Sequence, residues 1–147
     1  MTVPRNLFNK PRGIRNNNPG NIRDNDQNKA VWLGEIEHGA NDDKDFLVFK
    51  DEVSGIRALI VLINTYRRKY GVTNIAQLIT KYAPSNENNT TAYINQVAKK
   101  IGVNPQHPIN FDAYMYRVVK AIIEHENGVK YYDFYTDEQF AEALARA

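Results

Sequence analysis

The sequence predicts a mostly α-helical (α+β) domain with about five helices and one small β-hairpin. Three observations favour this fold class. Apolar residues recur at helical spacing through most of the chain after residue 50. Capping residues and glycines mark the ends of these segments. Only residues 30–49 contain short extended pieces, which flank a polar segment and predict the hairpin.

The predicted helices have recognisable ends. In chain order they cover residues 51–71, 73–83, 91–101, 111–127 and 136–147. Asn110 is placed to cap the fourth helix, and Thr136 with Gln139 forms a capping box at the start of the fifth. Gly71 and Gly102 follow two of the other helices, at the position where a left-handed residue commonly ends a helix.

Length and composition indicate one domain. The chain has 147 residues, of which 42% are hydrophobic, so it can bury a core without disulfide bonds. Residues 1–12 are polar and contain two prolines, which predicts a flexible N-terminal arm before a single domain over residues 13–147.

The segment RGIRNNNPGNIR, residues 12–23, is predicted to be an ordered, turn-rich loop framed by Ile14 and Ile22. Asparagine and glycine tolerate positive φ, and Pro19-Gly20 suits a tight turn.

Charge and composition argue against several classes of function. The formal net charge is only +2, which is too small to indicate nucleic-acid binding. No apolar run approaches the length of a membrane span, and the N-terminus lacks the apolar core of a signal peptide, so no membrane insertion is expected. Without cysteine there is no thiol-rich zinc site, and the isolated His125 is more often structural than a ligand. No metal or cofactor is expected.

A glutamate lies near the end of the predicted helix over residues 111–127, after an apolar run. On a helical wheel Glu126 continues the inward stripe of Met115, Val119 and Ile122, whereas Glu124 falls on the outer face. Burial beside apolar side chains raises the pKa of a carboxyl, which suits a general acid. A structural glutamate that accepts hydrogen bonds from a loop would show the same pattern, so the residues alone leave both interpretations open.

The stretch AIIEHENG, residues 121–128, resembles the catalytic helix of lysozyme-like lytic transglycosylases, whose signature is approximately A-I-I-x-x-E-S-G. The resemblance places Glu126 on the catalytic glutamate of that family and Asn127 on its serine, which is a departure from the pattern. Two other stretches resemble segments of the related bacterial glucosaminidases. They are NNPGNIR followed by Trp32-x-Gly34, and YAPSNENNTTAYINQV, residues 82–97.

The order of these segments differs from that in the families they resemble, because the helix that resembles the catalytic one comes last here. The resemblance therefore implies a circularly permuted lysozyme-like domain. The resemblance extends to small lysozyme-like proteins of bacteriophage virions, which implies a virion protein that acts in the host periplasm and cell wall. The implied partners are peptidoglycan glycan strands and other virion proteins.

The resemblance implies cleavage of the β-1,4 bond between N-acetylmuramic acid and N-acetylglucosamine, with Glu126 as general acid and base. The implied substrate-binding residues are Tyr82, Asn88, Asn21, Asn127, Tyr93 and Trp32. A hydrolase would usually need a second carboxylate, for which the candidates are Glu87, Glu35 and Glu37. A lytic transglycosylase would not need one and is the favoured interpretation. The alternatives are a hydrolytic muramidase or glucosaminidase on the same fold, and a virion structural or glycan-binding protein without catalysis.

Overall fold

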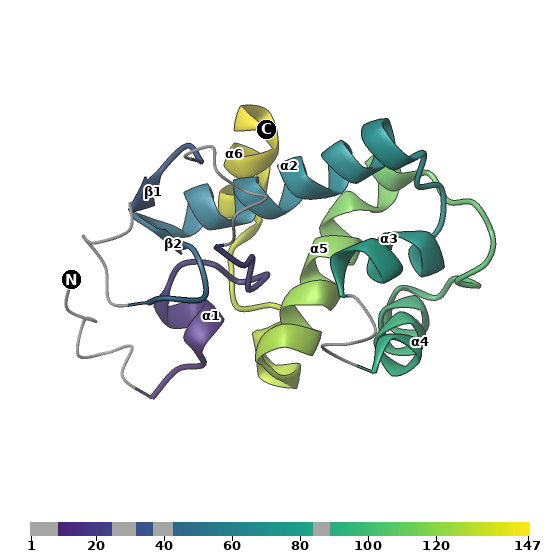
Figure 1. Ribbon diagram of the computed structural model, residues 1–147, viewed down its shortest axis with the longest axis horizontal. Helices are drawn as coiled ribbons and strands as arrows, with labels where there is room; N and C mark the ends of the chain where they lie inside the picture. The colour runs from purple at the N-terminus through teal and green to yellow at the C-terminus, as the bar shows by residue number, and fades with distance from the viewer. Residues whose placement is uncertain (1–8, 25–31, 37–42, 84–88) are drawn as a thin grey trace.

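The computed structural model of the chain describes residues 9–24, 32–36, 43–83 and 89–147 (Figure 1). Along the chain the elements are α1 (Arg12–Arg15), β1 (Glu35–Ile36), β2 (Val48–Phe49), α2 (Glu52–Tyr70), α3 (Ile75–Tyr82), α4 (Thr90–Ile101), α5 (Phe111–Asn127), the 3-10 turn η2 (Val129–Tyr131) and α6 (Asp137–Arg146). The predicted class, mostly helical with one small antiparallel strand pair, is confirmed.

Side chains at the helix ends satisfy backbone groups as the sequence predicted. The Asn110 side chain accepts a hydrogen bond from the backbone N–H of Ala113, and Thr136 and Gln139 form the capping box of α6. Such caps contribute about 1 kcal/mol each. Gly71 and Gly102 have φ of 64° and 77° after α2 and α4, a conformation in which glycine has no steric penalty.

The segment predicted as a loop begins with one helical turn, α1. The carbonyl of Pro11 accepts hydrogen bonds from the backbone N–H groups of Ile14 and Arg15, which closes that turn and corrects the prediction for these residues. The rest of the segment is turn-rich as expected, and Asn17 and Asn21 have φ of 51° and 50°. Of the predicted arm, residues 1–8 lie outside the described part of the chain.

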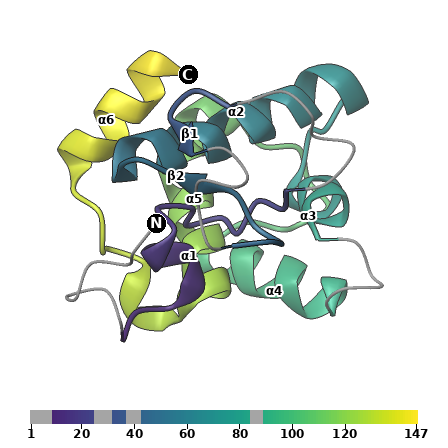
Figure 2. The same ribbon diagram turned by 60° about the vertical axis from the view of Figure 1, so that its left-hand side comes forward.

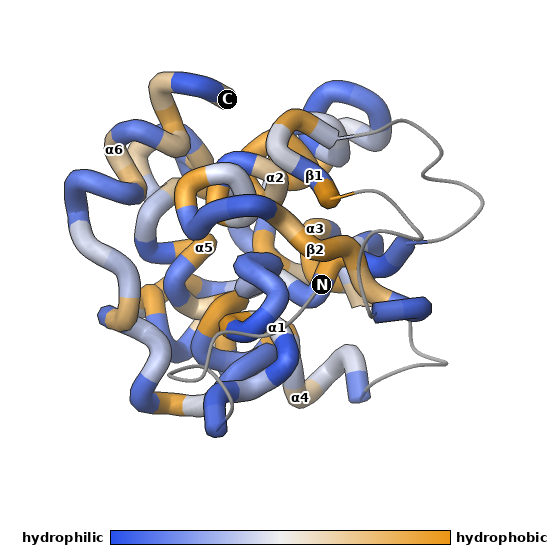
Figure 3. The backbone as a smooth tube through the Cα atoms, turned by 90° about the vertical axis from the view of Figure 1, so that its left-hand side faces the viewer, coloured by the Kyte–Doolittle hydropathy of each residue, from blue (hydrophilic) through white to orange (hydrophobic). Residues whose placement is uncertain are grey.

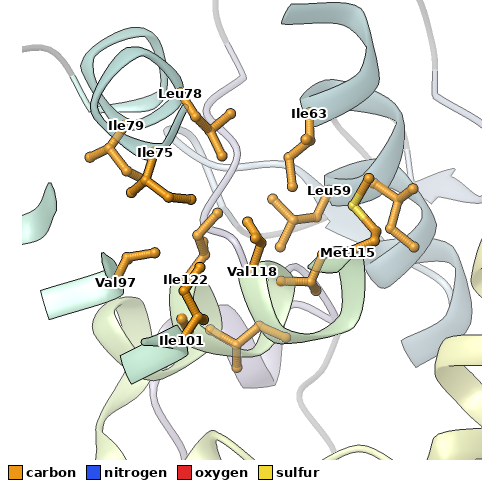
Figure 4. Packing of buried hydrophobic residues seen from close by; sticks show 14 of the residues in the cluster. Leu59, Ile63, Ile75, Leu78, Ile79, Val97, Ile101, Met115, Val118 and Ile122 are labelled. Carbon is orange, nitrogen blue, oxygen red and sulfur yellow. The ribbon is translucent and has the colours of Figure 1, made fainter. Parts of the chain in front are cut away.

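Helix α5 forms the centre of the main core. Figures 1 and 2 show it crossing the molecule, with α2 above it, α3 and α4 on one side and α1 on the other. Its buried side chains meet apolar residues of α2, α3 and α4 (Figure 4). The labelled residues there are Leu59, Ile63, Ile75, Leu78, Ile79, Val97, Ile101, Met115, Val118 and Ile122. Burial of each large aliphatic side chain contributes about 1.5–3 kcal/mol.

The strand pair lies over a second, smaller apolar cluster. Glu35 pairs with Phe49 and Ile36 with Val48 in antiparallel register. The buried members of this cluster are Ile22, Leu47, Phe49 and Ala58, with Trp32 and Leu62 packed against them. Figure 3 shows β2 coloured as hydrophobic and α1 beside it as mainly hydrophilic.

A charged contact joins α1 to the chain before β2. The Arg12 guanidinium donates two hydrogen bonds of 2.6 Å to the Asp43 carboxylate, and the Asn16 side-chain amide donates a third at 2.8 Å. Burial acts to raise the pKa of Asp43. The bonds from Arg12, from the backbone N–H groups of Phe46 and Asp45, and from Asn16 outweigh it and hold that pKa well below its usual range.

Because of this contact, the free energy of unfolding depends on pH in the acid range. Because the folded state depresses the pKa of Asp43, its contribution is complete above about pH 4 and is lost as the pH falls further. We expect Asp43→Asn to lower the free energy of unfolding at pH 7 by about 1–3 kcal/mol. The deficit should shrink between pH 4 and pH 2.5 in urea unfolding curves. A deficit that stays constant over that range would contradict this account.

Candidate active site

The carboxylate of Glu126, in the last turn of α5, receives two hydrogen bonds from distant parts of the chain. The Asn21 side-chain amide donates to Oε1 at 2.9 Å, and the Tyr93 hydroxyl donates to Oε2 at 2.8 Å. Glu126 is half-buried, and α1 and α4 both pack against its helix (Figure 1). Both donors stabilise the ionised carboxylate, which opposes the effect that burial alone would have.

The predicted stripe of α5 explains why Glu126 lies here. Met115, Val119 and Ile122 are 2%, 0% and 0% exposed, and Glu126 follows Ile122 by four residues on the same face. The prediction for Glu124 was wrong. Glu124 is 9% exposed, and its Oε2 lies 3.3 Å from Lys100 Nζ of α4. A wheel for one helix cannot show that a second helix covers its outer face.

Two tyrosines border the carboxylate. Tyr93 is 0% exposed, and Tyr82 meets it edge-on with 6.4 Å between ring centroids. The Tyr82 hydroxyl donates to the carbonyl of Gly20, beside Asn21. Burial raises the pKa of both tyrosines well above the ordinary value, and the charge of Glu126 raises it further. Both hydroxyls therefore keep their protons at neutral pH and remain hydrogen-bond donors.

Asn127 links the end of α5 to the N-terminal loop. Its side-chain amide donates to the carbonyl of Pro19 at 2.8 Å and to that of Ile123 at 3.0 Å. The Oδ1 atoms of Asn127 and Asn21 lie against Gly13 of α1, where an added Cβ would be only 2.6 Å and 2.8 Å from them. Sequence reasoning did not identify Gly13, because its segment was predicted to be a loop and one of the amides that pack on it comes from Asn127, far along the chain.

His125 and Gln96 form a further contact between α5 and α4. The His125 ring stacks on Tyr93 with 3.5 Å between centroids and 24° between planes, and its Nδ1 lies 2.6 Å from Gln96 Oε1. Burial lowers the pKa of His125. On the helical wheel His125 falls on no clear face, and no pattern in the sequence distinguished Gln96.

The other predicted site residues are placed as follows. Trp32 packs on the small apolar cluster, and its backbone N–H donates to Glu35 Oε1 at 3.0 Å, which gives Glu35 a local role in the turn before β1. Glu37, Glu87 and Asn88 lie outside the described residues. The prediction of a second carboxylate therefore stays a prediction.

Within the described ranges, no three His, Asp or Glu side chains are grouped so that they could hold a metal ion. None of the helices described is both long enough and apolar enough to span a bilayer.

The packing of Gly13 against the two amides predicts whether the substitution Gly13→Ala stabilises or destabilises the protein. In an isolated helical turn Gly→Ala is stabilising by about 0.5–1 kcal/mol. We expect Gly13→Ala instead to lower the free energy of unfolding by about 1–3 kcal/mol, because the methyl group would press on the Asn127 and Asn21 side chains and on the backbone carbonyl of Asn18.

The control is the shorter side chain of Asn127→Ser, which removes the tightest of the three contacts with the methyl group. In a double-mutant cycle by urea unfolding, Gly13→Ala should cost less in the Asn127→Ser background than alone. Strict additivity would show that this contact does not cause the loss.

Comparison with known proteins gives the family. No protein-family model matches the sequence. Over 123 residues, which make up 84% of this chain and 75% of the relative, the chain is 42% identical to "Protein P5" of Pseudoalteromonas phage PM2. Identity of this extent over most of both chains establishes common descent, and the chain belongs to the same family as protein P5 of phage PM2.

Proposed function

We propose that this protein is a peptidoglycan-degrading enzyme of the lytic transglycosylase type, with Glu126 as general acid and base. One observation carries the proposal. The three segments that resemble lysozyme-like enzymes are far apart in the sequence, yet Asn21, Tyr93 and Glu126, one from each, are joined by hydrogen bonds. Chance resemblances in three unrelated segments would give no reason for these side chains to meet.

The proposal includes the fold and its permuted order. A mostly helical domain with one small strand pair and a central helix ending in the acid is compatible with a lysozyme-like domain. The helix with Glu126 comes after the loop with Asn21 in the sequence, whereas in the families that these segments resemble the catalytic helix comes first, and a circular permutation would account for the difference.

The chemistry needs one carboxyl group that gives and takes a proton. Glu126 protonates the glycosidic oxygen while the bond from C1 of N-acetylmuramic acid to that oxygen breaks. The 6-hydroxyl of the same sugar then forms a bond to C1 and returns its proton to Glu126, which leaves a 1,6-anhydro product. The first step requires the protonated form, whereas Asn21 and Tyr93 favour the carboxylate. The mechanism therefore requires that, when the glycan binds, one of these two donors forms its hydrogen bond with the glycan and no longer with Glu126.

The neighbouring residues have distinct roles in this proposal. Asn21 and Tyr93 contact the reacting carboxyl, while Tyr82 and Asn127 fix the loop through the carbonyls of Gly20 and Pro19. Asn88 and Trp32 are proposed to contact the sugar. Glu35, Glu37 and Glu87 would matter only to the hydrolytic alternative.

A phage setting is supported by the relationship to a phage protein. We propose that the protein belongs to the virion, where it is held by other virion proteins. There it would open the host cell wall during penetration or release.

Glu126→Gln tests the acid role, because the amide keeps the shape and cannot give up a proton as a carboxyl does. We expect the activity on purified sacculi, in a zymogram and by turbidity, to fall at least about 100-fold. Glu138→Gln is the matched control, since Glu138 is an exposed carboxylate on α6, and it should match the wild type. Glu124 is unsuitable as the control because it is buried against Lys100. Full activity in Glu126→Gln would reject the assignment.

The products distinguish the alternatives. Mass spectrometry of digested sacculi should show 1,6-anhydromuramic acid ends, which are lighter by one water than the reducing ends made by a hydrolase. Reducing muramic acid ends would instead identify a muramidase, and reducing glucosamine ends a glucosaminidase. Binding to sacculi without new ends would indicate a protein without catalysis.

A further inference from the structure

His125 contacts Tyr93, which donates a hydrogen bond to the proposed acid, Glu126. The contact is made through the flat face of the imidazole ring. Its imidazole stacks on Tyr93, and the Tyr93 hydroxyl donates to Glu126. His125 and Glu126 are neighbours on α5, while Tyr93 is on α4, so the three side chains close a loop of contacts between the two helices.

The position of the Tyr93 hydroxyl depends on its ring, because the C–O bond lies on the long axis of the ring. Tyr82 meets the Tyr93 ring edge-on, at 77° between planes, and His125 covers a face at 24°. Stacked and edge-on aromatic pairs are each worth more than their buried area alone. Removal of the stacked ring would free space beside the face of Tyr93 and allow its hydroxyl to move away from Glu126.

His125 is itself held in place by Gln96. The side-chain amide of Gln96 lies within hydrogen-bond distance of the imidazole, with 2.6 Å between Oε1 and Nδ1 of His125. Gln96 follows Tyr93 by three residues and lies on nearly the same face of α4. The imidazole therefore has a fixed plane, set by a residue outside the site itself.

We propose that His125 is a positioning residue that holds the ring of Tyr93, so that the Tyr93 hydroxyl stays hydrogen-bonded to Glu126. The consequence for turnover rests on the proposed function, whereas the consequence for Glu126 itself does not. Neither the acid chemistry nor the resemblance to transglycosylases assigns His125 or Gln96 a role.

Three variants separate the effect of the stacked His125 ring from the effect of its contact with Gln96, and a fourth is the control. His125→Ala removes both, His125→Phe keeps a flat ring, and Gln96→Ala removes only the partner of Nδ1. Asn95→Ala is the matched control, because Asn95 is exposed on the same helix. For each variant we would measure kcat and KM on isolated glycan strands. Carbon NMR would give the titration midpoint of the Glu126 carboxyl, and thermal unfolding would confirm that the protein is folded during the assay.

If His125 positions Tyr93, His125→Ala should shift the pH dependence of kcat upward by as much as the Glu126 midpoint, with little change in KM, because the lost bond acts at the reacting group. The titration midpoint of Glu126 should rise by about one pH unit, since a donor to the carboxylate is lost. His125→Phe should recover most of both effects, and Gln96→Ala should have a smaller effect than His125→Ala.

Three results would overturn the inference. One is an unchanged Glu126 midpoint in His125→Ala, even if the variant is less stable. Another is equal impairment in His125→Phe and His125→Ala, and the last is a rise in KM alone. If the wild-type protein has no activity on glycan strands, the proposed function fails, and the midpoints alone decide whether His125 positions Tyr93.

Discussion

Two side-chain amides tie the end of α5 to the loop near the N-terminus, and the geometry of the candidate site depends on them. Asn21 reaches from the loop to Glu126, and Asn127 reaches from the helix to the carbonyl of Pro19. The two bonds run in opposite directions between the same two segments. They hold the carboxylate and one of its donors together as a unit, and Gly13 leaves the space in which both amides fit.

The apolar core explains why this unit has a defined position. One face of helix α5 is buried from Phe111 to Ile123, and its stripe of large side chains packs against α2, α3 and α4 (Figure 4). Because a helix is rigid over this distance, packing at Met115 and Ile122 sets the direction in which Glu126 points. On the other side, Tyr93 belongs to the same core, so both partners of its hydrogen bond to Glu126 are held by the same packing.

Much of this arrangement could be predicted from the sequence, and the failures have physical causes. Capping residues and glycines set the helix ends closely, since their effect is local. The inward direction of Glu126 followed from helical periodicity. The same method failed for Glu124, because a wheel describes one helix and α4 also covers that face. Gln96 and Gly13 could not be singled out, since their roles depend on side chains that only the fold brings near.

Asn21 and Glu126 are far apart in the sequence, and this separation determines when the site can form during synthesis. Asn21 and Glu126 are 105 positions apart, so their contact closes a long stretch of chain. Closing such a stretch costs entropy that only the packed core can offset. During synthesis the loop emerges well before α5, and the Asn21 amide has no carboxylate beside it until α5 has also been made. The site can therefore assemble only after α5 has been made, and a truncated chain that ends before α5 lacks the site entirely.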